Sequence, residues 1–297
     1  MTSNAEPRMY YALDAIGGYD GMFNRENVLA SAGVAYRNPS SEMFGIHIPK
    51  NPAHLMIDSG GFQAATRWNG ALAGERGLPG RFPYSPRELH DWAEKIRADV
   101  VAGMDVACEL ATNLFDMEKG YIWPESYRKR ILESRDNQMR QRRVYESQGY
   151  SHDFMPVIQG REKGEYEEFI QWMAAEGFDQ YDRIAVGTVC KRSDLDEILN
   201  IVLLVREYFP KKWIHLFGAT LEIYKDRRFD GLYSSSDTAA WNWGGESKAH
   251  KKELFAEYQQ KVEGYRGDVI PQNRLKQSKS RERTPGTSVQ SGPAKKS

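Results

Sequence analysis

Six apolar runs in this chain end on a residue that can bind or react with a ligand. These residues are Asp58, Asp105, Gln159, Gly187, Gly218 and Asp237. Three carboxylates gathered in one place need a reason, because a buried carboxylate is costly unless it is paired or hydrogen-bonded. The first of them opens the stretch DSGGFQ (58–63), in which Gly60 and Gly61 leave room for a flat ligand to approach the backbone.

Paired carboxylates can carry out retaining glycosyl transfer. One attacks the anomeric carbon, and the other handles the proton of the leaving group. The residues alone therefore indicate acid/base chemistry, with glycosyl transfer as one form of it, and they do not identify the substrate. For each aspartate taken singly, the alternative is a helix cap.

Eight apolar runs of five to eight residues must position these side chains. They read MYYAL (9–13), VLASAGVA (28–35), HLMID (54–58), DVVAGMD (99–105), DFMPVIQ (153–159), RIAVGT (183–188), WIHLFGA (213–219) and GLYSSSD (231–237). Continuous apolar runs are typical of parallel strands buried on both faces. Helical patterns with caps at 85–98, 165–177 and 193–209 lie between several of them.

This alternation of strands and helices predicts an α/β fold, a (β/α)8 TIM barrel, whose chemistry lies at the carboxyl ends of the strands. An open doubly wound sheet is the alternative, but its phosphate loop G-x-G-x-x-G is missing after the first strand.

Composition sets the limits of the domain. Of 297 residues, 40% are hydrophobic, enough for a large core. Residues 1–272 are expected to form one domain, and 273–297 a basic, disordered tail. From Arg274 to Ser297 there are seven Lys/Arg and one Glu, about +6, so the remaining chain carries about −6. The tail is either a solvated terminus or a loose contact for an anionic polymer.

Cysteine content and hydropathy exclude several classes of protein. Two cysteines, Cys108 and Cys190, are too few for a disulfide scaffold or for a zinc site built from three or four cysteines. No apolar run reaches 18 residues, and the first 25 residues lack a signal-peptide core. We expect a cytoplasmic protein without a membrane partner.

Several segments carry a resemblance to a known family. MIDSGGFQ (56–63) resembles the Asp-Ser-Gly-Gly-Phe-Gln signature of tRNA-guanine transglycosylases. Further segments resemble that family in the same order: ADVVAGMDVACE (98–109) its base-recognising strand, PVIQG (156–160) its Val-Gln-Gly segment, RIAVGTV (183–189) its Ala-Ile-Gly-Gly loop and HLFGAT (215–220) its Met-Gly-Val-Gly turn.

The chain also departs from that family. It lacks the Cys-x-Cys-x-x-Cys and His of the family's zinc subdomain, and it is shorter. The nucleophile segment of the family, Phe-Asp-Cys-Val-x-Pro-Thr-Arg, is replaced by FDGLYSSSDTAAWN (229–242). This change resembles the DNA-directed paralogues of phages, archaeal viruses and modification systems, which insert 7-deazaguanine derivatives into DNA. For a viral protein the expected location is the host cytoplasm.

The resemblance implies roles for the strand-end residues. Asp237 would attack C1′ and form a covalent intermediate, with Asp230 as the competitor for this role, and Asp58 would be the general acid/base. The residues implied in binding the base are Ser59, Gly60, Gly61, Phe62, Gln63, Asp105, Gln159, Gly160 and Gly187. Phe62 is either a wall of the base slot or a core residue. Exchange of one base for another requires no cofactor, and no metal site is expected.

A base inside a duplex is out of reach, so the guanine must be flipped out or single-stranded. We expect phosphate contacts from Arg67, Arg161, Lys163, Lys191 and Arg192, while the basic helix at 125–145 is either a further contact or an ordinary solvated face. His54 and His215 are expected to be hydrogen-bonded core residues, and Trp241 and Trp243 either stack on the substrate or pack in the core.

The implied partners are DNA and a free 7-deazaguanine base, with proteins that deliver the base or open the helix left open. Two other functions stay open, namely the same exchange on tRNA and an inactive nucleic-acid-binding barrel.

Overall fold

A parallel β-sheet forms the centre of the computed structural model, which describes residues 7–13, 22–37, 43–66, 74, 76–78, 80–108, 124–190, 192–242 and 247–281. All its strand pairs are parallel, and the segments follow the order β5-β4-β3-β2-β1-β9-β8-β7-β6. Their bounds are Arg8–Ala12 (β1), Asn27–Ser31 (β2), His54–Asp58 (β3), Val100–Ala102 (β4), Asp153–Met155 (β5), Val157–Ile158 (β6), Arg183–Val186 (β7), Trp213–Leu216 (β8) and Ser235–Thr238 (β9).

The first and last segments of this order, β5 and β6, are separated in the chain by Pro156 alone. Proline has no backbone N–H, which explains why the strand is divided there. β5 pairs with β4, and β6 pairs with β7. The sheet therefore returns to its own start and forms a TIM-type α/β barrel of eight strands, with β5 and β6 as one strand. The predicted barrel is confirmed, and the open sheet is excluded.

Strand side chains divide between two apolar clusters. The smaller cluster contains buried residues from strands only, which places it inside the barrel: Tyr10, Leu29, Met56, Val100, Ala102, Met155, Val157 and Ala185. The larger cluster joins the outer strand faces to the helices. The continuous apolar runs in the sequence follow from this burial on both faces.

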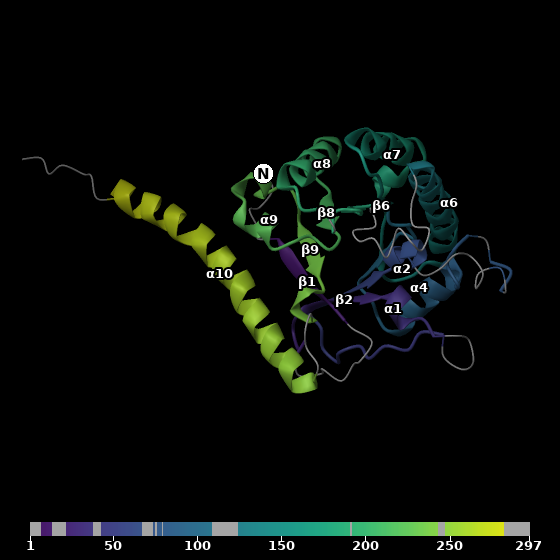
Figure 1. Ribbon diagram of the computed structural model, residues 1–297, viewed down its shortest axis with the longest axis horizontal. Coiled ribbons are helices and arrows are strands. Elements are labelled where there is room, and N and C mark those ends of the chain that lie inside the picture. Colours follow the sequence, from purple (N-terminus) through teal and green to yellow (C-terminus); the bar gives the residue numbers. More distant parts are fainter. Residues whose placement is uncertain are drawn as a thin grey trace, which may run out of the picture.

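Helices surround the barrel (Figure 1). Their bounds are Ala32–Ala35 (α1), Gly61–Thr66 (α2), Pro86–Lys95 (α4), Pro124–Gln148 (α6), Lys163–Ala175 (α7), Leu195–Tyr208 (α8), Glu222–Lys225 (α9) and Lys248–Arg281 (α10), with 3-10 turns at Phe178–Gln180 (η1), Arg227–Phe229 (η2) and Ala240–Asn242 (η3). Among the described helices none is both long and apolar enough to cross a bilayer.

The helix caps follow the sequence signals closely. Ser85 and Glu88 form the predicted capping box at the start of α4. The helix expected from residue 193 is capped one residue later, at Asp194, whose side chain accepts from the amides of Asp196 and Glu197.

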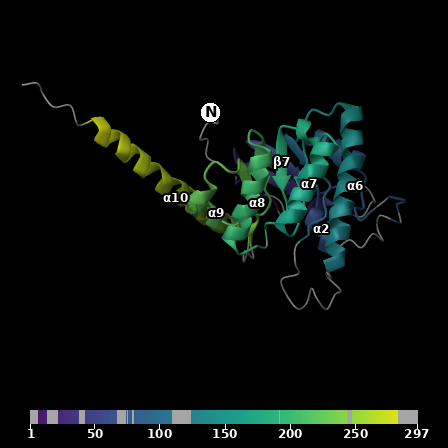
Figure 2. The same cartoon turned by 90° about the horizontal axis from the view of Figure 1, so that it is seen from above.

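The last helix, α10, packs its first half against the barrel through Phe255, Tyr258 and Val262, and then extends away from it (Figure 2). It continues to Arg281, into the segment expected as a basic tail, and residues 282–297 lie outside the described part of the chain.

Two glutamines of α6 bridge the barrel where β4 and β6 diverge. Gln138 bonds both the N–H and the C=O of Val157, at 2.8 and 2.9 Å. Gln141 accepts from the amide of Met104 and donates to the carbonyl of Ala102 at 3.1 Å. The two side-chain amides together tie α6 to the backbone of β6 and to that of β4 and the residues just after it. Gly103 permits this, since a Cβ there would lie 2.4 Å from Gln138 Oε1.

Candidate active site

Asp58 and Asp237 point into the barrel at its carboxyl end. Side chains alternate along a strand, so Asp58 shares the face of Met56, an interior residue. Asp237 is in register with Tyr10, a second interior residue. Each aspartate lies at or next to the end of its strand. This is the end at which TIM barrels place their chemistry.

The pKa of Asp58 reports its surroundings. Burial raises it to about 6, the hydroxyl of Ser31 and the amide of Gly60 oppose this shift, and the charge of Asp237 adds to it. Asp58 and Asp237 therefore interact through their charges across the barrel. A carboxyl group with this pKa exchanges a proton readily near neutral pH, as a general acid/base must.

Asp237 is anchored through one oxygen. Its Oδ1 accepts from the amide of Gly218 at 2.7 Å and lies 3.3 Å from His215 Nε2. Gly218 has a φ of 61°, a left-handed conformation that suits glycine. The strand-end Gly218 of the sequence thus contributes its backbone N–H to the site.

Asp105 lies three residues beyond β4. It is the first member of a buried series of hydrogen bonds that continues through Gln159 and Thr188. Ser59 Oγ donates to its Oδ1 at 3.1 Å, and Gln159 Nε2 donates to its Oδ2. Thr188 Oγ1 in turn donates to Gln159 Oε1 and accepts from the amide of Cys108 at 2.9 Å. Burial and the charge of Asp58 raise the pKa of Asp105 to about 7, against the lowering effect of these donors.

Two of the predicted site glycines make room for side chains of the protein itself. A Cβ on Gly61 would lie 2.5 Å from Asp105 Oδ1, and a Cβ on Gly187 would lie 2.2 Å from Gln159 Nε2. Gly61 and Gly187 therefore let Asp105 and Gln159 pack tightly. The space that the sequence assigned to a flat ligand is therefore filled: Asp105 lies beside Gly61, and an added Cβ on Gly60 would lie 2.8 Å from Gly33 Cα and 2.9 Å from the Tyr84 hydroxyl, so any base must lie beyond these residues.

The remaining predicted base-slot residues differ in their placement. Phe62 is 40% exposed at the first turn of α2, so the alternative of a core residue is wrong. Gln63 turns toward α1, where a Cβ on Gly33 would lie 2.5 Å from its Oε1. Gly160 packs against Tyr166 of α7, whose amide would lie 2.8 Å from an added Cβ.

The residues predicted to contact phosphate also differ in their placement. Lys163 is exposed as the first residue of α7, and Arg161 is partly buried two residues before it. The side chain of Arg192 is only 10% exposed, pairs with Glu197 and donates to the carbonyls of Thr188 and Arg161. Arg192 therefore clamps two loops together instead of facing solvent. Arg67 and Lys191 lie outside the described residues.

Basic residues of α6 are partly neutralised. Arg128 pairs with Glu168, and Arg142 pairs with Glu146. Lys129 and Arg143 are exposed.

The other candidate site residues lie away from the two carboxylates. Asp230 is exposed in the turn before β9, away from the carboxyl end of that strand, which favours Asp237. His54 begins β3, at the opposite end of that strand from Asp58, and contacts Arg8 Nη1 at 2.8 Å; its side chain is 36% exposed, so the expected core position is wrong. Trp241 is buried and donates to the carbonyl of Ala12 at 3.0 Å, a core position, while Trp243 lies outside the described residues.

Three neighbours of the site had no clear sequence signal. Thr188 orients Gln159 although its φ of 56° is unusual for a β-branched residue. Buried Tyr84 donates to the carbonyl of Ser59 at 2.5 Å. His215 is buried as expected, but its partners include Asp237. The contact with Asp237 joins neighbouring strands and was not indicated by the sequence.

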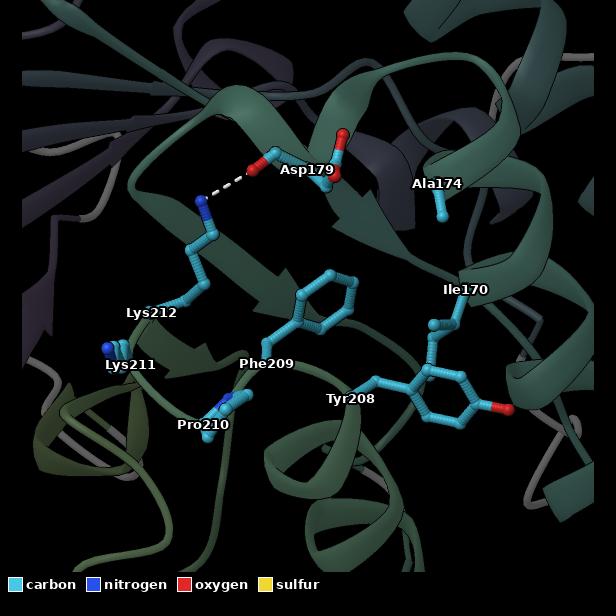
Figure 3. A pocket seen from close by; sticks show the side chains of 8 residues that line it. All are labelled: Ile170, Ala174, Asp179, Tyr208, Phe209, Pro210, Lys211 and Lys212. Atoms are coloured by element: carbon cyan, nitrogen blue, oxygen red, sulfur yellow. Dashed lines mark hydrogen bonds between the residues drawn. The ribbon is translucent and has the colours of Figure 1, made fainter.

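A surface hollow of about 300 Å³ lies elsewhere (Figure 3), lined by Ile170, Ala174, Asp179, Tyr208, Phe209, Pro210, Lys211 and Lys212. Asp179 precedes β7, and Lys212 precedes β8, so the hollow is at the amino ends of these strands. It is separate from the carboxylate site.

No family model and no curated protein sequence matches this chain. Within the described residues, no group of three or more His, Cys, Asp or Glu side chains is arranged to hold a metal ion.

Proposed function

We propose that this chain is a base-exchange transglycosylase that replaces guanine in DNA with a 7-deazaguanine derivative. The observation that carries the proposal is the placement of Asp58 and Asp237 inside one end of the barrel, close enough for the charge of one to raise the pKa of the other. Two carboxyl groups in different environments suit a division into nucleophile and general acid/base.

In the proposed first step, Asp237 attacks C1′ of the deoxyguanosine. The bond from C1′ to the base breaks, and Asp58 donates a proton to the departing guanine. The product is an ester between Asp237 and the deoxyribose. In the second step the incoming base attacks C1′, Asp58 takes its proton, and the ester bond breaks. The two displacements retain the configuration at C1′.

Asp105 and Gln159 are the proposed base-recognition pair. Each Asp105 oxygen already accepts one hydrogen bond from the protein and keeps acceptor capacity for the N1–H and exocyclic amine of guanine. Adenine lacks this pair of donors. Exposed Phe62 at the start of α2 offers a face for stacking on the base.

The preference for DNA over tRNA rests on the sequence. The nucleophile segment Ser235-Ser236-Asp237 resembles the DNA-directed paralogues, and two cysteines cannot form the cysteine-rich zinc subdomain of the tRNA enzymes. Exposed Lys163 and partly buried Arg161, after β6, are the described residues proposed to contact phosphate.

The test is incorporation of labelled guanine by the purified chain with duplex DNA, single-stranded DNA or tRNA, with Asp237→Asn as the control. Label in DNA alone supports the proposal. Label in tRNA alone supports the alternative substrate. Nucleic-acid binding without incorporation identifies an inactive binding barrel.

A further inference from the structure

His215 is a fully buried polar residue inside the barrel, on β8. Aromatic rings fix its orientation. Tyr10 and Phe217 meet its imidazole edge to face, with ring centroids 5.8 and 4.7 Å away. An imidazole held in this way presents each nitrogen in a defined direction.

A hydrogen-bond chain passes through this imidazole. Trp213 Nε1 donates to Ser235 Oγ at 2.8 Å, Ser235 Oγ lies 2.9 Å from His215 Nδ1, and His215 Nε2 lies 3.3 Å from Asp237 Oδ1. The indole N–H is a donor only, so Ser235 Oγ is its acceptor. The serine hydroxyl hydrogen is then free to point at Nδ1. An ionised Asp237 can only accept, so a neutral imidazole facing it carries its hydrogen on Nε2, and Nδ1 then accepts from the serine hydroxyl.

The second donor to Asp237 falls on the same oxygen. The amide of Gly218 donates to Oδ1, the oxygen that faces His215. Among the residues that the structure describes, none donates to Oδ2. One oxygen is therefore anchored, and the other keeps its lone pairs for a reaction.

We propose that His215 is a positioning residue that holds Asp237 by Oδ1, so that Oδ2 attacks, and that Trp213 and Ser235 fix the histidine in its Nε2–H form. The effect on rate rests on the proposed transglycosylase function. The tautomer does not, because it follows from contacts within the protein alone.

The tautomer is measured directly by ¹⁵N NMR of the substrate-free protein with labelled histidine, above pH 8. The His215 signals are assigned by their loss in His215→Gln. We expect His215 in the Nε2–H form, and Ser235→Ala should shift the tautomer population of His215 toward the Nδ1–H form. A wild-type His215 in the Nδ1–H form overturns the inference.

The positioning effect is measured as the single-turnover rate of covalent adduct formation with DNA. His215→Gln keeps an N–H donor near the position of Nε2 and should stay within about tenfold of wild type. His215→Leu removes the donor and should lose about 100-fold, with DNA affinity unchanged. Equal losses in the two variants overturn the inference, because a purely structural role does not depend on the donor.

His250→Gln, at an exposed position of α10, is the matched control and should behave as wild type. If His215→Leu fails to fold, Ser235→Ala replaces it and should lower the adduct rate without affecting DNA affinity; an unchanged rate contradicts the inference. If wild type forms no adduct on DNA, the proposed function fails, and the tautomer measurement alone decides the role of His215.

Discussion

The strands of Asp58 and Asp237 are separated in the sheet by β2 and β1, yet the charge of Asp237 contributes to raising the pKa of Asp58 to about 6. The charge of Asp237 therefore acts on Asp58 across the interior of the barrel. Asp237 Oδ1 accepts from the amide of Gly218 and lies 3.3 Å from His215 Nε2, whereas burial is the largest cause of the raised pKa of Asp58. This difference is the basis on which the proposed mechanism gives the proton to Asp58 and the attack to Asp237.

Adduct formation should depend on the protonation of Asp58. Its proton is present below about pH 6, so at saturating DNA the rate of guanine release should fall as the pH rises, by about tenfold per unit above that value. A pH series of rapid-quench measurements from pH 5 to 8 tests this. A rate that increases over that range contradicts the role of Asp58 as the acid.

Asp58→Asn should abolish release of guanine but retain release of N7-methylguanine. The methylated base is already cationic in the nucleoside and departs without a proton from the enzyme. We expect a loss of at least about 100-fold on guanine-containing DNA and of less than about tenfold on the methylated DNA, by measurement of the released base. Equal losses on both substrates show that Asp58 does not act as the acid.

Thr188 should act on base binding through its hydroxyl. Thr188→Ser keeps the donor to Gln159 and should leave the Kd of guanine within about threefold of wild type. Thr188→Val keeps the shape but removes the donor to Gln159 Oε1 and the acceptor of the Cys108 amide, so guanine should bind about tenfold more weakly. Calorimetry with the free base distinguishes these outcomes. Matching affinities in the two variants rule out an orienting role.

Two glycine substitutions should change stability in opposite directions. Gly103→Ala places a Cβ 2.4 Å from Gln138 Oε1, and Gln138 cannot move without losing its two bonds to Val157, so we expect a loss of about 1–3 kcal/mol. Gly164→Ala, in α7 with nothing within 4 Å, should gain about 0.5–1 kcal/mol. Urea unfolding measures both. A neutral Gly103→Ala would show that the α6 bridge is dispensable.

Acid should destabilise the fold through His90 and His152. His90 is fully buried, its Nδ1 lies 2.8 Å from His152 Nε2, and burial lowers the pKa of His90 to about 3 and that of His152 below its usual value. A histidine with a lowered folded pKa contributes its full stability above its unfolded value, near 6.5, and loses it as the pH falls.

Between pH 7 and pH 5, His90 should account for a decrease of about 2 kcal/mol in the free energy of unfolding. His90→Asn should flatten this pH dependence, while His250→Asn, at an exposed position, should not. Parallel pH curves for wild type and His90→Asn contradict this account.

The strands were predictable because burial on both faces produces continuous apolar runs. Each of the eight runs overlaps a strand of the barrel, although residues 32–35 form α1, and β9 begins at Ser235 rather than at Gly231. The strand-end rule also placed Asp58 and Asp237 correctly at the carboxyl end. These features depend on local pattern and on barrel topology alone.

The contacts around the carboxylates were not predictable in this way. Thr188 bonds the amide of Cys108, 80 residues earlier, and Gly61 accommodates Asp105. Arg192 was predicted to contact phosphate, but its guanidinium pairs with Glu197 and donates to two backbone carbonyls. Such roles arise from side chains that meet only in the folded chain, and no spacing in the sequence encodes them.

Mass spectrometry of the chain trapped with guanine-containing DNA identifies the residue that attacks C1′. We expect a covalent adduct on the peptide that contains Asp237, which is absent in Asp237→Asn and retained in Asp230→Asn. An adduct on Asp230, or a full adduct in Asp237→Asn, contradicts this expectation.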